Sequence, residues 1–109
     1  MNSEQPQYCI VITTCASQTD AENIIGPLLR ERLAACVQVF QIMSYYTWKG
    51  EQAKEPEHIL LIKALARLYP AIERSIRANH KYETPEIVQV PIVAGSESYL
   101  GWMKEVSLS

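Results

Sequence analysis

A long extended stretch in the middle of the chain constrains the fold more than any other feature. Residues Val37 to Lys49 are rich in Val, Ile, Phe, Tyr, Thr and Trp, which favour β-strands. Gly50 interrupts the stretch, and Glu57 to Ala64 predicts the returning strand of an antiparallel hairpin. A strand of about 13 residues is unusually long for a small domain. The fold must therefore be built around a hairpin that is longer than the core of so small a domain can cover.

Two shorter apolar runs predict strands on either side of this hairpin. Tyr8 to Thr14 is a β-branched run and is typical of a buried strand. Glu86 to Val93 predicts the last strand, and Pro91 marks it as an edge strand or as one that ends early, because proline cannot donate to the ladder.

Helical spacing appears between the strands and at the end of the chain. Thr19 and Glu22 form a capping-box pattern ahead of the first helix, in which Gly26-Pro27 predicts a kink or a late start. A second helix follows Leu65, with Pro70 tolerated in its first turn. Ser96 is the expected N-cap of a short C-terminal helix.

The predicted order is β-α-β-β-α-β with an added C-terminal helix, which is the plan of an α+β, ferredoxin-like sandwich. A length of 109 residues allows a single domain. We expect that domain to span residues 8–109, preceded by a flexible, polar N-terminal segment over residues 1–7.

Charge and cysteine content narrow the functional classes. A net charge of -2 argues against nucleic acid as a partner, and the apolar runs are too short to cross a membrane. Cys9, Cys15 and Cys36 lack the Cys-x-x-Cys spacing of a structural zinc site, and their odd number does not indicate a disulfide framework. We therefore expect a reduced, cytoplasmic protein.

The predicted topology gathers polar groups at one end of the sheet. Cys15 at the end of the first strand and His80 at the end of the second helix lie there, with Tyr82 and Glu86. Cys36 lies at the opposite end. A thiol and an imidazole suit copper or zinc. The structural alternative stays open, with Cys15 as a buried apolar residue and His80 as a helix-end residue. A Cys–His nucleophile lacks a third, orienting group, so we expect no enzymatic activity.

The hairpin carries more apolar surface than two helices can cover. Its aromatic residues Tyr45, Tyr46 and Trp48 lie in the far half of the long strand. Burial against another copy of the chain would cover this edge, so we expect a closed homo-oligomer.

Four sequence blocks resemble the CutA divalent-cation-tolerance family. They occur in order between about Tyr8 and Val106, and they are Arg32 to Val37, Tyr45 to Gly50, His80 to Ile87 and Tyr99 to Trp102. The resemblance implies a PII-like homotrimer in the cytoplasm that is linked to copper and other divalent metals and is not an established enzyme.

The resemblance also implies particular site residues. Cys15 and His80 correspond to the copper ligands, although Asn79 replaces the first of two paired histidines and Lys81 replaces a common proline. It further implies inter-subunit clefts lined by five residues, which are Trp48, Lys63, Tyr82, Glu86 and Trp102.

Two functions follow as expectations. The first is a non-catalytic, trimeric protein that binds copper, with zinc and other divalent cations as alternatives, at Cys15 and His80. The second is a PII-like sensor or scaffold that binds a small molecule at the inter-subunit clefts.

Overall fold

The computed structural model describes residues 6–109, so most of the N-terminal segment expected over residues 1–7 lies outside the described residues. Gln7 is described, and its carbonyl oxygen accepts a hydrogen bond of 2.8 Å from the Ala66 amide. Eight elements follow in order, and they are β1 (Tyr8–Cys15), α1 (Gln18–Arg30), β2 (Cys36–Trp48), β3 (Glu51–Leu65), the 3-10 turn η1 (Ala66–Leu68), α2 (Tyr69–Asn79), β4 (Ile87–Ile92) and α3 (Glu97–Val106).

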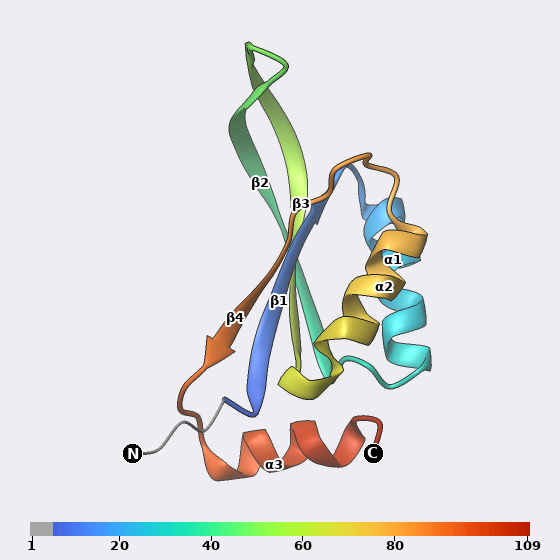
Figure 1. Cartoon of the computed structure of the whole chain (residues 1–109), viewed down its shortest axis with the longest axis vertical. Coiled ribbons are helices and arrows are strands. Elements are labelled where there is room, and N and C mark those ends of the chain that lie inside the picture. Colours follow the sequence, from blue (N-terminus) through green and yellow to red (C-terminus); the bar gives the residue numbers. More distant parts are fainter. Residues whose placement is uncertain (1–5) are drawn as a thin grey trace.

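The four strands form one antiparallel sheet in the order β2-β3-β1-β4. Helices α1 and α2 lie side by side on one face of the sheet, and α3 lies across its lower end (Figure 1). This arrangement confirms the predicted ferredoxin-like fold and its added C-terminal helix. No helix within residues 6–109 has the length and apolar content needed to span a membrane.

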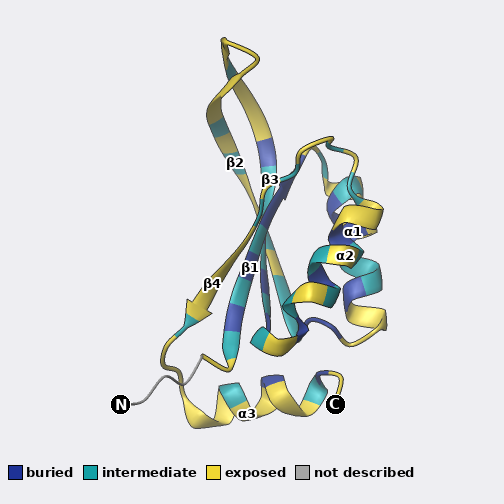
Figure 2. Cartoon of the chain, in the orientation of Figure 1, coloured by how far each residue is buried: buried dark blue, intermediate teal, exposed yellow. Residues whose placement is uncertain are grey.

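The hydrophobic core lies between α1, α2 and the sheet face that they cover. Strand β1 sends alternate residues into it, and Cys9 and Val11 are fully buried. The helices contribute Ile24, Leu28 and Ile72, which are buried to the same extent. Figure 2 shows buried residues concentrated where the helices meet the sheet, whereas the hairpin tip is exposed.

The first helix begins earlier than the capping-box pattern predicts. Ser17, not Thr19, is the N-cap, and its hydroxyl accepts a hydrogen bond of 3.1 Å from the Asp20 amide. The helix then continues through Pro27 to Arg30, so the predicted late start near Gly26 is wrong. Packing of the apolar face over both halves of the helix outweighs the cost of one proline.

The returning strand β3 is longer than predicted, because it begins at Glu51 and not at Glu57. Residues 51–56 carry charges and a proline, which disfavour strands in isolation. Pairing with β2 imposes the extended conformation, since the ladder continues to Trp48 opposite Glu51. Lys49 and Gly50 close the hairpin with positive φ angles of 52° and 83°, which fit the twist of the strands.

Other predictions of local structure are confirmed. Pro70 lies in the first turn of α2, and Ser96 caps α3 by accepting from the Tyr99 amide at 3.3 Å. Strand β4 is an edge strand, and its Pro91 pairs with Cys9.

Among residues 6–109, α1 and α2 leave the other face of the sheet uncovered, and we name that face the open face. The strand registers place a mostly apolar set of residues there, namely Ile10, Ile12, Phe40, Ile42, Ile59, Leu61, Val88 and Val90. Phe40 is 52% exposed and Val88 is 45% exposed. An apolar face of this extent is unusual for a protein that remains a single chain.

Candidate functional site

Cys15 ends β1 in a closed environment. Its side chain is 1% exposed, and the thiol donates to the carbonyl oxygen of Ser17 at 3.6 Å. Burial raises the pKa of the Cys15 thiol, a backbone hydrogen bond from Ser17 lowers it in part, and the negative charges of Asp20 and Glu57 raise it further. A metal ion would therefore have to displace a firmly held proton to bind this sulfur.

The structure brings His80 to the same end of the sheet, as the topology predicts. Its Nε2–H donates to the carbonyl oxygen of Thr14 at 2.7 Å, next to Cys15 in the chain. Its Nδ1 accepts from the Tyr82 amide at 3.1 Å, which fixes the tautomer. Both ring nitrogens are thus occupied by the backbone, and His80 fastens the loop after α2 to the end of β1.

Tyr82 and two carboxylates complete this polar end. The Tyr82 hydroxyl donates to Glu57 at 2.7 Å, and Glu57 is 8% exposed. Burial, the hydrogen bond to Glu57 and the nearby negative charges all raise the pKa of Tyr82. Burial raises the pKa of Glu86, and the charge of Glu57 adds to it. The charges of Glu57 and Glu86 therefore repel each other at this end of the sheet, which favours a positively charged ligand.

No complete metal site forms among residues 6–109 of the chain. Within residues 6–109, no group of three or more His, Cys, Asp or Glu side chains converges closely enough to hold an ion. The ammonium group of Lys81, which follows His80 in the chain, is paired with the Asp20 carboxylate at 3.0 Å. We name the end of the sheet with Cys15, Glu57, His80, Tyr82 and Glu86 the thiol end, and in one chain it offers a partial ligand set.

The five residues expected to line clefts fall in three separate regions of one subunit. Tyr82 and Glu86 lie at the thiol end, and Trp48 lies at the hairpin tip with the Lys49 ammonium 5.6 Å from its ring centre. Lys63 and Trp102 belong to the opposite end. These residues can line one cleft only if different subunits contribute them.

That opposite end contains a small aromatic group. The Lys63 ammonium lies 5.5 Å from the centre of the Tyr99 ring, and the Tyr99 and Trp102 rings are 5.6 Å apart. Tyr99 is 38% exposed and Trp102 is 40% exposed, so both rings are accessible. Tyr99 was not among the predicted cleft residues.

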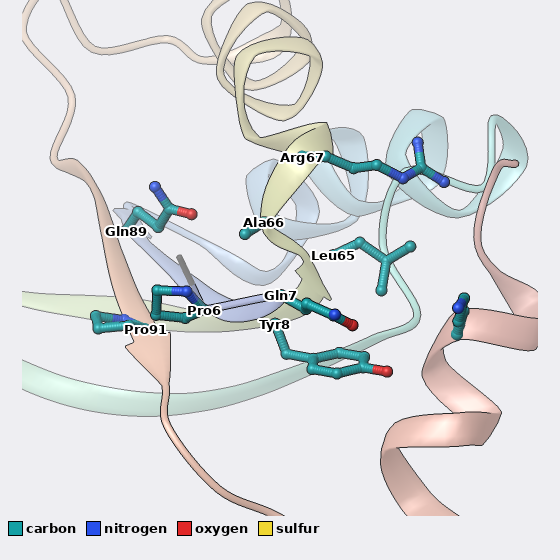
Figure 3. A pocket seen from close by; sticks show the side chains of 9 residues that line it. Pro6, Gln7, Tyr8, Leu65, Ala66, Arg67, Gln89 and Pro91 are labelled. Atoms are coloured by element: carbon teal, nitrogen blue, oxygen red, sulfur yellow. The ribbon is translucent and has the colours of Figure 1, made fainter. Parts of the chain in front are cut away.

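A groove of about 760 Å³ runs between the start of β1, the edge strand β4 and the end of α3. Figure 3 shows Tyr8, Arg67 and Gln89 around it. None of the predicted site residues lines this groove.

Sequence reasoning missed two residues at the thiol end. The sequence pattern marks Glu57 only as the first residue of a strand, and it assigns no role to His58. The strand register pairs His58 directly with Cys15. The signal that could have found them is this register, which aligns the end of β1 with the middle of the hairpin.

Comparison with known proteins agrees with the fold and with the sequence blocks. The family model described as CutA1 divalent ion tolerance protein matches residues 9–106. The divalent-cation tolerance protein CutA of Thermus thermophilus is 38% identical over 97 residues, which is 88% of this chain and 94% of that protein. Human Protein CutA is 36% identical over 97 residues, and this chain spans 54% of its length.

Solved structures give the same result. CutA1 from the psychrotrophic bacterium Shewanella sp. SIB1 superposes with a TM-score of 0.92 at 36% identity, covering 97% of this chain and 100% of that one. The periplasmic divalent cation tolerance protein CutA from Archaeoglobus fulgidus gives 0.89 at 31% identity, covering 91% and 97%. The chain therefore belongs to the CutA1 divalent ion tolerance family.

Proposed function

We propose that the chain is a trimeric, non-catalytic protein that contributes to metal tolerance by binding copper or a related cation at the thiol end of its sheet. The observation that carries this proposal is the buried Cys15 thiol at the end of β1, on which the negative charges of Asp20 and Glu57 act. Sulfur selects soft ions, and the neighbouring negative charge favours any cation.

Cys15 is the anchoring ligand in this proposal. His80, the second ligand expected from the sequence, would have to release both of its backbone hydrogen bonds to join it. Three free cysteines fit a reducing compartment, and we place the protein in the cytoplasm on that basis.

The trimer is supported by the open face. Phe40, Val88 and Val90 are each more than two-fifths exposed in one subunit, and they lie on strands from both edges of the sheet. Three copies that turn these faces toward a common axis would bury them all. The partial ligand set at the thiol end could be completed in such an assembly.

Native mass spectrometry with and without substoichiometric copper tests both parts. We expect a trimer that takes up one copper per chain and a Cys15→Ser variant that remains trimeric without copper. Cys36→Ser is the matched control, because Cys36 lies at the far end of β2, and it should bind as the unaltered protein does. A trimer that ignores copper, or Cys15→Ser that still binds it, would contradict the metal assignment. A monomer would contradict the assembly.

A second function is favoured by the exposed Tyr99 and Trp102 rings beside Lys63, a combination that suits a small planar or anionic molecule. In this alternative the trimer is a sensor or scaffold. Binding of a metabolite without copper should change the fluorescence of Trp102, and Trp102→Phe should abolish that change while Trp48→Phe retains it. An unchanged spectrum across a metabolite collection would remove the support for this alternative.

A further inference from the structure

His58 lies beside Cys15 within the fold. The register of β1 and β3 pairs the two residues directly, so both side chains point to the sheet face that α1 and α2 cover. Residues paired in this way have Cβ atoms about 4.5–5.5 Å apart, close enough for one small ion to contact both side chains. Thr13 lies on the same face, two residues before Cys15.

Two buried polar atoms in this neighbourhood lack a hydrogen-bond partner among the described residues, and they are His58 Nδ1 and Thr13 Oγ1. Thr13 is fully buried. Buried polar atoms are nearly always paired, so each unpaired one calls for a partner. Because both atoms are enclosed within a single subunit, a neighbouring subunit cannot supply that partner. The missing partner must be small enough to sit inside the fold.

The other histidine, His80, has hydrogen-bond partners for both of its ring nitrogens. His80 uses Nε2 and Nδ1 in hydrogen bonds to Thr14 and Tyr82. His58 Nδ1 keeps an unused lone pair when its Nε2 carries the proton. Of the two histidines, His58 is therefore the one prepared to ligate an ion.

We propose that Cys15 and His58 form a two-ligand internal site for a soft monovalent cation of the Cu(I) type. This inference rests on the proposed function and assigns the second ligand to His58. On binding, the sulfur–proton bond of Cys15 breaks, a sulfur–metal bond forms and the proton leaves to solvent. His58 donates its Nδ1 lone pair, and the ion keeps its oxidation state. The nearby Thr13 hydroxyl can donate a hydrogen bond to the metal-bound sulfur.

The charge balance favours a monovalent ion at this position. One thiolate and one monovalent cation sum to zero, so the complex can lie in an apolar core without a large desolvation cost. Zn(II) takes four ligands in most protein sites, so the pair formed by Cys15 and His58 would leave a zinc ion incompletely coordinated. Cu(I) and Ag(I) should therefore bind here more tightly than Zn(II).

Competition against a chromogenic Cu(I) chelator under anaerobic conditions tests the ligand assignment. We expect Cys15→Ser and His58→Gln each to weaken Cu(I) binding by more than about tenfold, since even indirect support of a metal ligand is worth about 10–100-fold. His80→Gln should retain the affinity, provided that circular dichroism shows it folded. Loss in His80→Gln with retention in His58→Gln would overturn the assignment.

A measurement on the unaltered protein removes any dependence on how the variants fold. In 15N-histidine-labelled protein, Ag(I) should shift the Nδ1 resonance of His58 and leave both nitrogens of His80 in place. A shift confined to His80 would overturn this inference and leave the proposed metal function intact. Binding of no ion at all would overturn both. Zn(II) bound as tightly as Ag(I) would contradict the charge argument.

Discussion

At the thiol end, some side chains stabilise the fold through hydrogen bonds, while a neighbouring side chain remains available to bind a ligand. Both ring nitrogens of His80 are hydrogen-bonded to the backbone, and the Tyr82 hydroxyl donates a hydrogen bond to Glu57. Cys15 makes one weak contact through its sulfur, to Ser17. The residues that close this end are thus distinct from Cys15, whose sulfur is the one with little hydrogen bonding.

Glu86 is expected to reduce stability at neutral pH. Its pKa is raised in the folded state by burial and by the charge of Glu57, so the folded protein holds this proton more tightly than the unfolded chain does. The loss of folding stability caused by the Glu86 charge is absent below the ordinary pKa of 4.5, and it reaches its full value once the pH exceeds the raised pKa of the folded state. Glu86→Gln should therefore raise the free energy of unfolding at pH 7, by less than about 1 kcal/mol because the side chain is largely exposed.

Urea unfolding at pH 7 and at about pH 3 checks this prediction, since the two proteins should be equally stable where the carboxyl is protonated in both states. Glu83→Gln, in the same loop, is the control and should have little effect at either pH. A Glu86→Gln variant that is less stable at pH 7 would show that the charge is paired.

The elements illustrate what a sequence can and cannot predict. The order of strands and helices follows from apolar periodicity, and Pro70 and Ser96 mark helix starts by their local chemistry. The first half of β3 could not be predicted, because Glu51 to Pro56 become a strand only through pairing with β2.

The same limit applies to the candidate site. Cys15 and His80 were brought to one end by topology alone, whereas the pairing of His58 with Cys15 depends on a register that no local pattern encodes. The enclosure of His58 Nδ1 depends in turn on how the chain packs around it. Site residues that lie at the ends of predicted elements can therefore be found from the sequence. Site residues whose position depends on strand register and packing cannot.

Helix α3 is held to the domain by the segment after α1. The Arg32 guanidinium donates to the carbonyl oxygens of Val106 and Ser107 at 3.1 and 3.2 Å, and the Leu108 amide donates back to Arg32 at 2.9 Å. Arg67 also donates to the Leu108 carbonyl oxygen. Two basic side chains thus satisfy carbonyl groups at and after the C-terminus of the helix.

Arg32→Ala should lower the free energy of unfolding by about 1–2 kcal/mol, because two hydrogen bonds from a charged donor are lost. The positive φ of 58° at this position is equally unfavourable for alanine, so the backbone adds no difference. Limited proteolysis should release the C-terminal segment sooner than in the unaltered protein. Arg74→Ala on the exposed side of α2 should stay within about 0.5 kcal/mol, and equal losses in both variants would contradict this role of Arg32.

At the scale of the whole molecule, the domain is asymmetric. One sheet face is covered by α1 and α2, and the open face is apolar and uncovered, while the β2–β3 hairpin extends beyond the helices (Figure 1). A single core cannot bury all of this surface, so association should supply a large part of the stability.

Phe40→Glu should dissociate the proposed trimer. Phe40 lies on the open face opposite Ile59, and a carboxylate buried there against two other copies would be unpaired. Gln41→Glu is the matched control, since it adds the same charge one residue later on the opposite face of the strand. Light scattering after size exclusion should give a monomer mass for the first variant and a trimer mass for the second. A trimeric Phe40→Glu would exclude the open face from the interface.

Association should also make unfolding depend on protein concentration. The midpoint temperature of the unaltered protein should rise as the concentration is raised tenfold, and that of Phe40→Glu should not. An unaltered protein with a constant midpoint would contradict a large contribution from the interface.

The position of β1 has a consequence for synthesis on the ribosome. This strand is made first, yet its partners are residues 58–65 of β3 and 87–92 of β4, so both of its edges stay unpaired until most of the chain has been translated. The β2–β3 hairpin, by contrast, can pair step by step from its turn as the residues of β3 leave the exit tunnel. A ribosome that pauses before residue 58 would hold an apolar strand with two free edges, which is the kind of segment that nascent-chain chaperones shield. Codon changes that slow translation over residues 16–57 should therefore lower the soluble yield more than changes after residue 92.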